Sequence, residues 1–240
     1  MKATDTWFSE RLGQDLTVVR WGMGGAPVLI FPTAGGDCEE IERFHVISVL
    51  EELIEAGRIR VYSVDSINGR AWLTGAGDEP SSRLMTTFDA AIRFEVVPAI
   101  WADNGQEKEV IVAGSSIGAF NALEVLCRHP DVFSAALCLS GTYDLSRWLD
   151  GPMPPDFYFS SPIHYLPGLD GPHLDALRQR FVLLAHGLGM AEDPAQSWQT
   201  AAVLGGQGVP NRVDEWGPEW PHDWVTWRAM FPRYLEELIS

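Results

Sequence analysis

The segment "VIVAGSSIGAFNAL", residues 110–123, holds a Gly-x-Ser-x-Gly pattern between an apolar run and a run with helical spacing. Ser116 is its central residue, with Gly114 and Gly118 two positions away on either side. A nucleophile elbow has this form, because a strand, a sharp strained turn and a helix lift the serine Oγ out of the carboxyl edge of a sheet. A Gly/Ser turn without chemistry is the competing interpretation. The strand and helix patterns on both sides favour a nucleophilic serine.

A serine hydroxyl is a poor nucleophile until a base accepts its proton, so this interpretation requires a histidine late in the chain. His222 lies in the loop between the last apolar run and the last helical pattern, opposite the expected elbow, and we predict that it is the base. A position beside Asp223 at the start of that helix is its alternative role. The other histidines fall in an early helix, after the elbow helix, in an irregular stretch or at a strand end: His45, His129, His164, His173 and His186.

An acid must orient that histidine, and the sequence leaves its identity open between three residues. In this kind of site the acid follows the strand before the last one, where "VLLAHGLGMAEDPAQSW" offers Glu192 and Asp193 side by side. Asp193 precedes Pro194 and fits a helix N-cap, which would turn its carboxylate toward backbone amides. We therefore predict Glu192 as the acid, with Asp144 in "SGTYDL" as the runner-up.

An oxyanion hole needs preorganised donors where negative charge develops. The backbone N–H of Ile117, directly after the nucleophile, is the first donor expected. The second should come from the loop "LIFPTAGGDCEE", where Gly35 and Gly36 allow open backbone conformations and Ala34 N–H is our candidate. A plain turn before a helix that starts near Asp37 explains this loop equally well.

The elements that must position these residues alternate between strand and helix. Apolar runs typical of buried strands occupy residues 17–21, 27–31, 58–65, 109–115, 134–141, 180–187 and 211–217. Helical spacing occupies residues 39–56, 81–101, 117–128, 194–206 and 224–238. Repeated strand–helix units predict an α/β fold with a mostly parallel central sheet and helices on both faces. The Pro- and Gly-rich stretch 150–175 is a long excursion that could cover a site.

The length and net charge of the chain indicate how many domains it forms and which classes of partner it can bind. At 240 residues we expect one domain over residues 1–240, because α/β folds of this size are often undivided. The formal charge of −16 argues against nucleic acid and anionic membranes as partners and is compatible with neutral substrates. The N-terminus lacks the apolar core of a signal peptide, and we see no membrane span, so a cytoplasmic location is expected.

The cysteines give no sign of a metal or disulfide site. Cys38, Cys127 and Cys138 are odd in number, and none forms a CxxC or CxxH pair. A disulfide framework or a zinc site is therefore improbable. The sequence gives no indication of the oligomeric state.

These residues resemble a known family, the putative esterase (esterase D-like) branch of the α/β-hydrolase superfamily. The most specific piece is the His-Asp-Trp-x-x-Trp of residues 222–227, which in similar proteins follows the last strand and carries the catalytic histidine. The resemblance also runs through "PVLIFPTAGGD", "VYSVDSINGRAW", "VPAIW", "VIVAGSSIGAFNAL", "ALCLSGTYDL", "YFSSPIHYLPGL" and the segment from "VPNRVDEWG" to "FPRYL".

That resemblance implies an eight-strand-type α/β-hydrolase sheet, a serine nucleophile at Ser116, the base His222 and hydrolysis of carboxylic esters without a cofactor or metal. The chain departs from the family at one point, since Pro32 and Thr33 stand where the oxyanion loop often reads His-Gly or Asp-Gly. Likeness of fold does not choose the acyl and alcohol parts of the substrate.

Aromatic residues give a weaker indication of a substrate pocket. Most of the ten tryptophans are expected to pack in the core. Trp72 and Trp148 lie in loops after strands, and Trp220 flanks the loop of the predicted base, so these three are our candidates for contacts with substrate.

The sequence thus predicts a serine carboxylesterase that acts on small soluble esters through an acyl-enzyme and has no large lid domain. Two alternatives stay open. An acyltransferase would use the same triad with an acceptor other than water. A non-catalytic binding protein of the same fold would have lost part of the triad, which the presence of Ser116 and His222 argues against.

Overall fold

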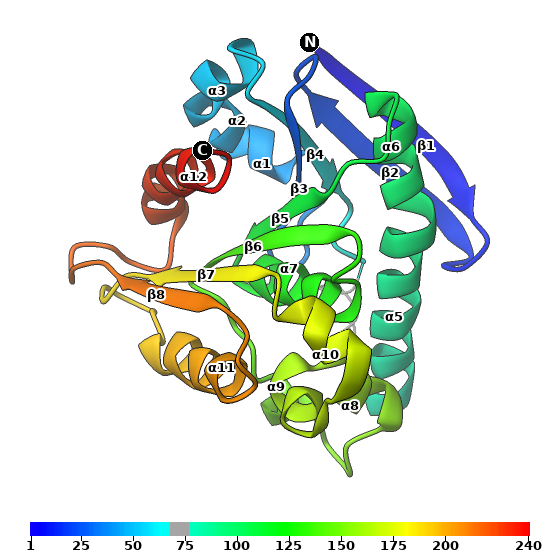
Figure 1. Ribbon diagram of the computed structural model, residues 1–240, viewed down its shortest axis with the longest axis vertical. Helices are drawn as coiled ribbons and strands as arrows, with labels where there is room; N and C mark the ends of the chain where they lie inside the picture. The colour runs from blue at the N-terminus through cyan, green and yellow to red at the C-terminus, as the bar shows by residue number, and fades with distance from the viewer. Residues whose placement is uncertain (68–76) are drawn as a thin grey trace.

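The computed structural model describes residues 1–67 and 77–240, and it centres on an eight-stranded sheet of order β1-β2-β4-β3-β5-β6-β7-β8 (Figure 1). The strands are β1 (Lys2–Ser9), β2 (Gln14–Trp21), β3 (Ala26–Phe31), β4 (Ile59–Val64), β5 (Val110–Ser115), β6 (Phe133–Leu139), β7 (Phe181–His186) and β8 (Asn211–Glu215). β2 pairs antiparallel with both β1 and β4, and every pair from β4 to β8 is parallel. The mostly parallel sheet predicted from the sequence is therefore confirmed.

The carboxyl ends of the parallel strands meet along one edge of the sheet, so the loops after β3, β5, β6, β7 and β8 are neighbours there. Ser116, Glu192, His222 and Ala34 lie in loops or turns at this edge, and Ile117 begins the helix that follows one of these turns. In open α/β sheets, ligands bind outside the carboxyl ends of the strands. The topology therefore gathers the candidate residues in one region.

Strand β1 was not predicted. It begins at the second residue and is mostly exposed, with the sequence "KATDTWFS", so it has no apolar run. It forms one edge of the sheet, where only β2 pairs with it. Pairing with β2, rather than burial, holds this strand in place, which explains why a search for apolar runs missed it.

Helices cover both faces of the sheet (Figure 1). The helices α1 (Glu40–Arg43), α2 (Val46–Val49), α3 (Glu51–Glu55) and α12 (Trp224–Leu238) pack on one face. The helices α5 (Asp78–Ala91), α6 (Val97–Asn104), α7 (Ile117–Arg128) and α11 (Pro194–Gly206) pack on the other. In the part of the chain that is described, no helix is both long and apolar enough to cross a membrane.

Two predicted helices differ from the observed ones. Residues 39–56 form the three short helices α1 to α3 instead of one: His45, with φ 63°, separates α1 from α2, and Leu50 separates α2 from α3. Residues 81–101 belong to a longer helical run in which a π-helical turn, η1 (Ile92–Val96), joins α5 to α6. The ranges predicted for α7, α11 and α12 agree with the structure.

The excursion at 150–175 contains short helical pieces rather than a plain loop. These pieces are α8 (Pro155–Ser160), α9 (Pro162–Tyr165), the 3-10 turn η3 (Leu166–Gly168) and α10 (Gly171–Leu177), and a further 3-10 turn, η2 (Ser146–Trp148), precedes them. α8 packs beside α5, and α9 contacts α7. The described residues form no separate lid domain, as predicted.

The elbow helix lies unusually close to the neighbouring strand. A Cβ atom added to Gly118, in the first turn of α7, would collide with the carbonyl oxygen of Phe31 and lie 2.7 Å from that of Pro32. Both are backbone atoms that no side-chain rotation can move. Only glycine at 118 therefore allows α7 to approach the end of β3, and this contact brings the loop after β3 to the nucleophile elbow.

This close approach predicts that Gly118→Ala lowers the free energy of unfolding by about 1–3 kcal/mol, the usual cost of overpacking. At this chain length, the melting temperature should fall by about 2–4 °C per kcal/mol. Gly206→Ala is the matched control, because a Cβ at Gly206 meets no atom within 4 Å among the described residues. Thermal unfolding followed by circular dichroism measures both, and equal melting temperatures for the two variants would contradict the close contact.

Candidate active site

Ser116 lies at the junction of β5 and α7 with φ 57° and ψ −120°. This conformation is uncommon for a residue with a side chain and is characteristic of strained functional turns. Three backbone hydrogen bonds hold it: Ser116 N donates to Leu139 O, while Ala119 N and Thr142 N donate to Ser116 O. The backbone geometry is that of a nucleophile elbow, with the serine side chain partly exposed.

His222 lies within hydrogen-bond distance of this serine. Its Nε2 is 3.1 Å from Ser116 Oγ, and its side chain is 24% exposed. Four other histidines bond elsewhere: His129 to Asp89, His164 to Ser161, His173 to Cys127 O and His186 to Glu215. The structure thus brings together the serine and the histidine that the sequence singled out, and this distance suits proton transfer between them.

Glu192 lies on the far side of the imidazole. Its Oε2 is 3.6 Å from His222 Nδ1, and its side chain is 2% exposed. Asp193 is exposed and occupies the N-cap of α11 as predicted, but its side chain makes no capping hydrogen bond, contrary to expectation. Asp144 instead accepts hydrogen bonds from the backbone N and the Oγ of Ser146. Of the three acids considered, Glu192 is the one that faces the histidine.

Two polar residues hold the Glu192 carboxylate in place. Ser140 Oγ donates to Glu192 Oε1 at 2.6 Å, and Trp227 Nε1 donates in turn to Ser140 Oγ at 3.0 Å. Gly187 N also donates to Oε1, at 3.3 Å. One carboxylate oxygen is therefore engaged by these donors, while the other oxygen faces the imidazole. A buried carboxylate needs such partners, because an unpaired buried charge is strongly unfavourable.

The loops that carry the acid and the histidine are joined through their backbones. His222 N donates to Met190 O at 3.0 Å, and Gly189 N donates to Trp220 O at 2.9 Å. A Cβ at Gly189 would lie 2.7 Å from that same Trp220 oxygen, so glycine allows the two loops to touch. The position of His222 relative to Glu192 is therefore set by backbone hydrogen bonds between the two loops as well as by side-chain packing.

The loop after β3 supplies free amides beside the elbow. Thr33 N donates to Glu40 Oε2, and Gly36 N donates to Thr33 O, so both of these amides are engaged. Among the residues that the structure describes, the amides of Ala34 and Gly35 donate to no protein acceptor. The N–H of Ile117, the first residue of α7, has no acceptor within its own helix. Free amides are thus present in the loop after β3 and at the start of α7.

Comparison with known proteins identifies the family of the chain. The family model described as "Putative esterase" matches residues 42–238. The chain belongs to this family. Comparison with curated protein sequences gives no significant match. Membership, together with the fold, makes the protein an esterase-type hydrolase of the α/β-hydrolase class.

Solved structures with the same fold include several hydrolases. A ferulic acid esterase has a TM-score of 0.76 at 18% identity, over 98% of this chain and 96% of its own. An S-formylglutathione hydrolase from Agrobacterium tumefaciens has a TM-score of 0.74 at 14% identity, over 100% of this chain and 94% of its own. The fluorophosphonate-binding serine hydrolase F of Staphylococcus aureus, solved with substrate bound, has a TM-score of 0.69 at 16% identity, over 100% of this chain and 98% of its own. At these identities the likeness concerns the fold.

An apolar cluster in the esterase adjoins the elbow. Ile117 packs with buried side chains from α5, from α7 and from the chain after β6. The buried members are Met85, Ile117, Phe120, Leu145 and Phe157, with Leu149 and Met153 packed against them. Ile117 is therefore bordered by apolar side chains, of which Phe157 and Met153 come from the excursion.

The three tryptophans proposed to contact substrate are placed differently from one another. Trp72 lies outside the described residues. Trp148 ends the turn η2 and is 39% exposed. Trp220 packs edge-to-face against Trp216, with ring centres 4.7 Å apart, and Trp216 in turn donates to Tyr234 Oη. Packing accounts for these contacts of Trp220, and contact of any of the three with substrate stays a prediction.

Sequence reasoning missed three residues that support the site. Ser140 has φ 46° directly after β6, and Trp227 is the final residue of the His-Asp-Trp-x-x-Trp motif. Their bonds to each other and to Glu192 join segments far apart in the chain. Glu40 is the third, with its carboxylate on Thr33. The tryptophan at a fixed distance from the predicted base was the one available signal.

The positions of the three acids yield a kinetic prediction. Glu192→Gln should lower kcat by about 10²- to 10⁴-fold at an unchanged melting temperature, because the imidazole loses the charge that orients it. Asp193→Asn and Asp144→Asn are matched controls that remove one charge nearby, and both should keep most of kcat. Steady-state kinetics with p-nitrophenyl acetate measures this. A large loss in either control, with Glu192→Gln active, would transfer the role to that aspartate.

Proposed function

We propose that the protein is a serine carboxylesterase that hydrolyses small soluble carboxylic esters through an acyl-enzyme. The observation that carries this proposal is the 3.1 Å distance between His222 Nε2 and the Oγ of Ser116, a serine held in a strained elbow. Nucleophilic catalysis requires this contact between nucleophile and base. Glu192 at 3.6 Å from Nδ1 supports the same assignment from the other side of the ring.

Acylation begins when the ester carbonyl carbon lies near Ser116 Oγ. His222 Nε2 accepts the hydroxyl proton while Oγ forms a bond to the carbonyl carbon, and the carbonyl oxygen becomes an oxyanion. The amides of Ala34 and Ile117 donate to that oxygen. Glu192 stabilises the imidazolium that forms. The C–O bond to the alcohol then breaks, and His222 returns the proton to the leaving oxygen, which leaves the acyl group on the serine.

Deacylation repeats these steps with water. His222 accepts a proton from water, the water oxygen attacks the acyl carbon, and the second tetrahedral intermediate is held by the same two amides. Its collapse breaks the bond to Ser116 Oγ, which regains the proton from the imidazolium. The products are the carboxylic acid and the free enzyme, and no cofactor or metal takes part in this scheme.

The substrate class follows from charge and from the excursion. The net charge of −16 disfavours strongly anionic partners, so neutral esters suit the surface. The apolar residues beside Ile117 offer contact to a short acyl group. Structures of the same fold include a protein named as a ferulic acid esterase and another named as an S-formylglutathione hydrolase. We favour small oxygen esters, and we also propose the cytoplasmic location and single domain expected from the sequence.

Two other functions remain distinguishable by experiment. An acyltransferase would use the same three residues. Added alcohols would then accelerate the breakdown of the acyl-enzyme by more than their effect on the solvent explains. A non-catalytic binding protein would show no turnover at all. The short contact between the serine and the histidine supports catalysis over the second alternative.

The proposal predicts that a fluorophosphonate labels Ser116 alone and stoichiometrically, because only a hydroxyl beside a base and oxyanion donors reacts readily. Mass spectrometry of the digested protein identifies the modified serine. Ser115 is the internal control, since it is one residue away but is buried at the end of β5. Labelling that persists in Ser116→Ala, or an active wild type that is never labelled, would contradict the assignment of Ser116 as the nucleophile.

The absence of a separate lid domain among the described residues predicts a preference for short acyl chains without interfacial activation. The rate with p-nitrophenyl esters should be highest for short acyl chains and fall as the chain lengthens. Initial rates across the solubility limit of a long-chain ester test the second part. A sharp increase above that limit would refute it.

A further inference from the structure

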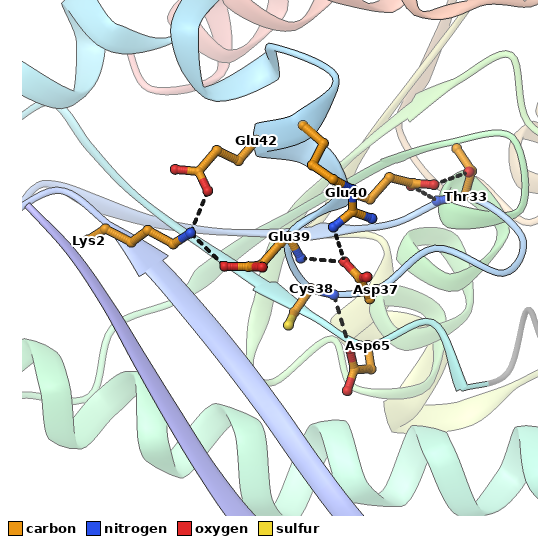
Figure 2. A network of polar contacts seen from close by, with 9 residues as sticks. Lys2, Thr33, Asp37, Cys38, Glu39, Glu40, Glu42 and Asp65 are labelled. Carbon is orange, nitrogen blue, oxygen red and sulfur yellow. Dashed lines mark hydrogen bonds and ion pairs between the residues drawn. The ribbon is translucent and has the colours of Figure 1, made fainter.

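The loop after β3 is clamped by a buried carboxylate that the proposed mechanism does not use. Glu40, the first residue of α1, is 7% exposed. Its Oε2 accepts Thr33 N at 2.7 Å, and its Oε1 accepts Thr33 Oγ1 at 2.8 Å (Figure 2). Both carboxylate oxygens therefore bind the single residue that precedes the predicted oxyanion donor, Ala34.

The same carboxylate fills the space beside Gly36. A Cβ atom at Gly36 would lie 2.5 to 2.6 Å from the carboxylate atoms of Glu40, so a side chain at this position would displace the carboxylate. Gly36 N donates back to Thr33 O at 3.1 Å, which closes the turn. Thr33 to Gly36 thus form a tight turn around Glu40, and the amides of Ala34 and Gly35 are the two in this turn without a protein acceptor among the described residues.

Other ionic contacts already anchor the rest of this segment. Lys2 of β1 pairs with Glu39 and Glu42, Arg43 pairs with Asp37, and Cys38 N donates to Asp65 Oδ1 (Figure 2). These carboxylates are more exposed than that of Glu40, which is the buried one in the segment. Anchoring alone does not require a buried carboxylate, and burying one is costly unless it is well bonded.

We propose that Glu40 is a positioning residue that sets the backbone of the oxyanion loop and so holds the Ala34 amide ready for the developing oxyanion. The inference rests on the proposed function. This role accounts for the departure of the chain from the family at Pro32 and Thr33. Glu40 binds both the hydroxyl and the amide of Thr33, and a residue without a hydroxyl would supply only the amide. Preorganised donors stabilise a transition state more than a ground state, so Glu40 acts on kcat rather than on KM.

Burial and hydrogen bonding act in opposite directions on the Glu40 carboxyl. The pKa of this carboxyl is raised overall, because burial outweighs the hydrogen bonds from the Thr33 amide and hydroxyl and the nearby Arg43, which lower it. The two bonds to Thr33 therefore stabilise the ionised form that the clamp uses. A neutral side chain that still accepts from the Thr33 amide should preserve part of the effect.

The test compares Glu40→Ala, Glu40→Gln and Glu39→Ala with the wild type in p-nitrophenyl acetate hydrolysis. Glu40→Ala should lower kcat by about 10²-fold, the usual effect of losing one oxyanion donor, while KM changes by less than about two-fold. Glu40→Gln should recover kcat to within about ten-fold of the wild type, because its carbonyl can still accept from the Thr33 amide. Glu39→Ala removes an exposed carboxylate one residue away and should leave kcat unchanged.

A pair of inhibitors separates positioning from general damage. A trifluoromethyl ketone binds a nucleophilic serine as a tetrahedral oxyanion adduct, whereas the matching methyl ketone binds without a stable adduct. Glu40→Ala should weaken the first by about 10²-fold and leave the second unchanged, because only the first places charge in the oxyanion hole. Equal weakening of both inhibitors would overturn the proposal, and so would a folded Glu40→Ala with the kcat of the wild type.

If Glu40→Ala does not fold, Thr33→Val decides the question. It removes the hydroxyl bond to the carboxylate and keeps the amide bond, and kcat should fall by about ten-fold with KM unchanged, as expected for one hydrogen bond to a charged group. An unaltered kcat in this variant would overturn the proposal. Failure of the proposed function would look different, because the wild type itself would then show no activity that depends on Ser116.

Discussion

The backbone of Ser116 at the junction of β5 and α7 is the constraint on which the rest of the site depends. Its positive φ carries a cost of about 1–3 kcal/mol, which persists only where the surroundings over-determine it. Hydrogen bonds to its N and O from β6 and the following chain, and the packing of α7 on β3 without a Cβ at Gly118, supply that support. Because α7 starts directly after the turn, its unsatisfied first amide lies beside the serine hydroxyl that the turn exposes.

A second layer of the structure keeps the acid and the base aligned. The Glu192 carboxylate is buried, and it is tied through Ser140 to Trp227 of α12, the helix that follows His222. The start of this helix is fixed by the Asp223 cap, whose side chain accepts from Trp224 N. The helix that follows His222 thus also contacts, through Ser140, the carboxylate that faces this histidine. This arrangement places Glu192 and His222 at the carboxyl edge of the sheet, while the apolar core lies below them.

Much of this could be predicted from the sequence, because the central strands are continuous apolar runs and the helices have clear spacing. The nucleophile elbow and the late histidine carry recognisable local patterns, so Ser116 and His222 could be named, and their proximity followed from the order of the elements. Strand β1 could not be found, since pairing rather than burial defines it. The break at His45 depends on a left-handed backbone conformation that cannot be predicted from the residue type. Ser140 and Glu40 act through contacts between distant segments or within a folded turn, which no local pattern encodes.

The central claim is that Ser116 carries the acyl group during turnover. The most direct test is to mix the enzyme with p-nitrophenyl acetate and to quench the reaction with acid within the first turnovers. Mass spectrometry of the quenched, digested protein then locates the acyl group. The account predicts an acetylated peptide with the modification on Ser116, formed as fast as the first molecule of p-nitrophenol is released, and none in Ser116→Ala. Turnover by the wild type with no acylated serine, or with the acetyl group on another residue at the same rate, would contradict it.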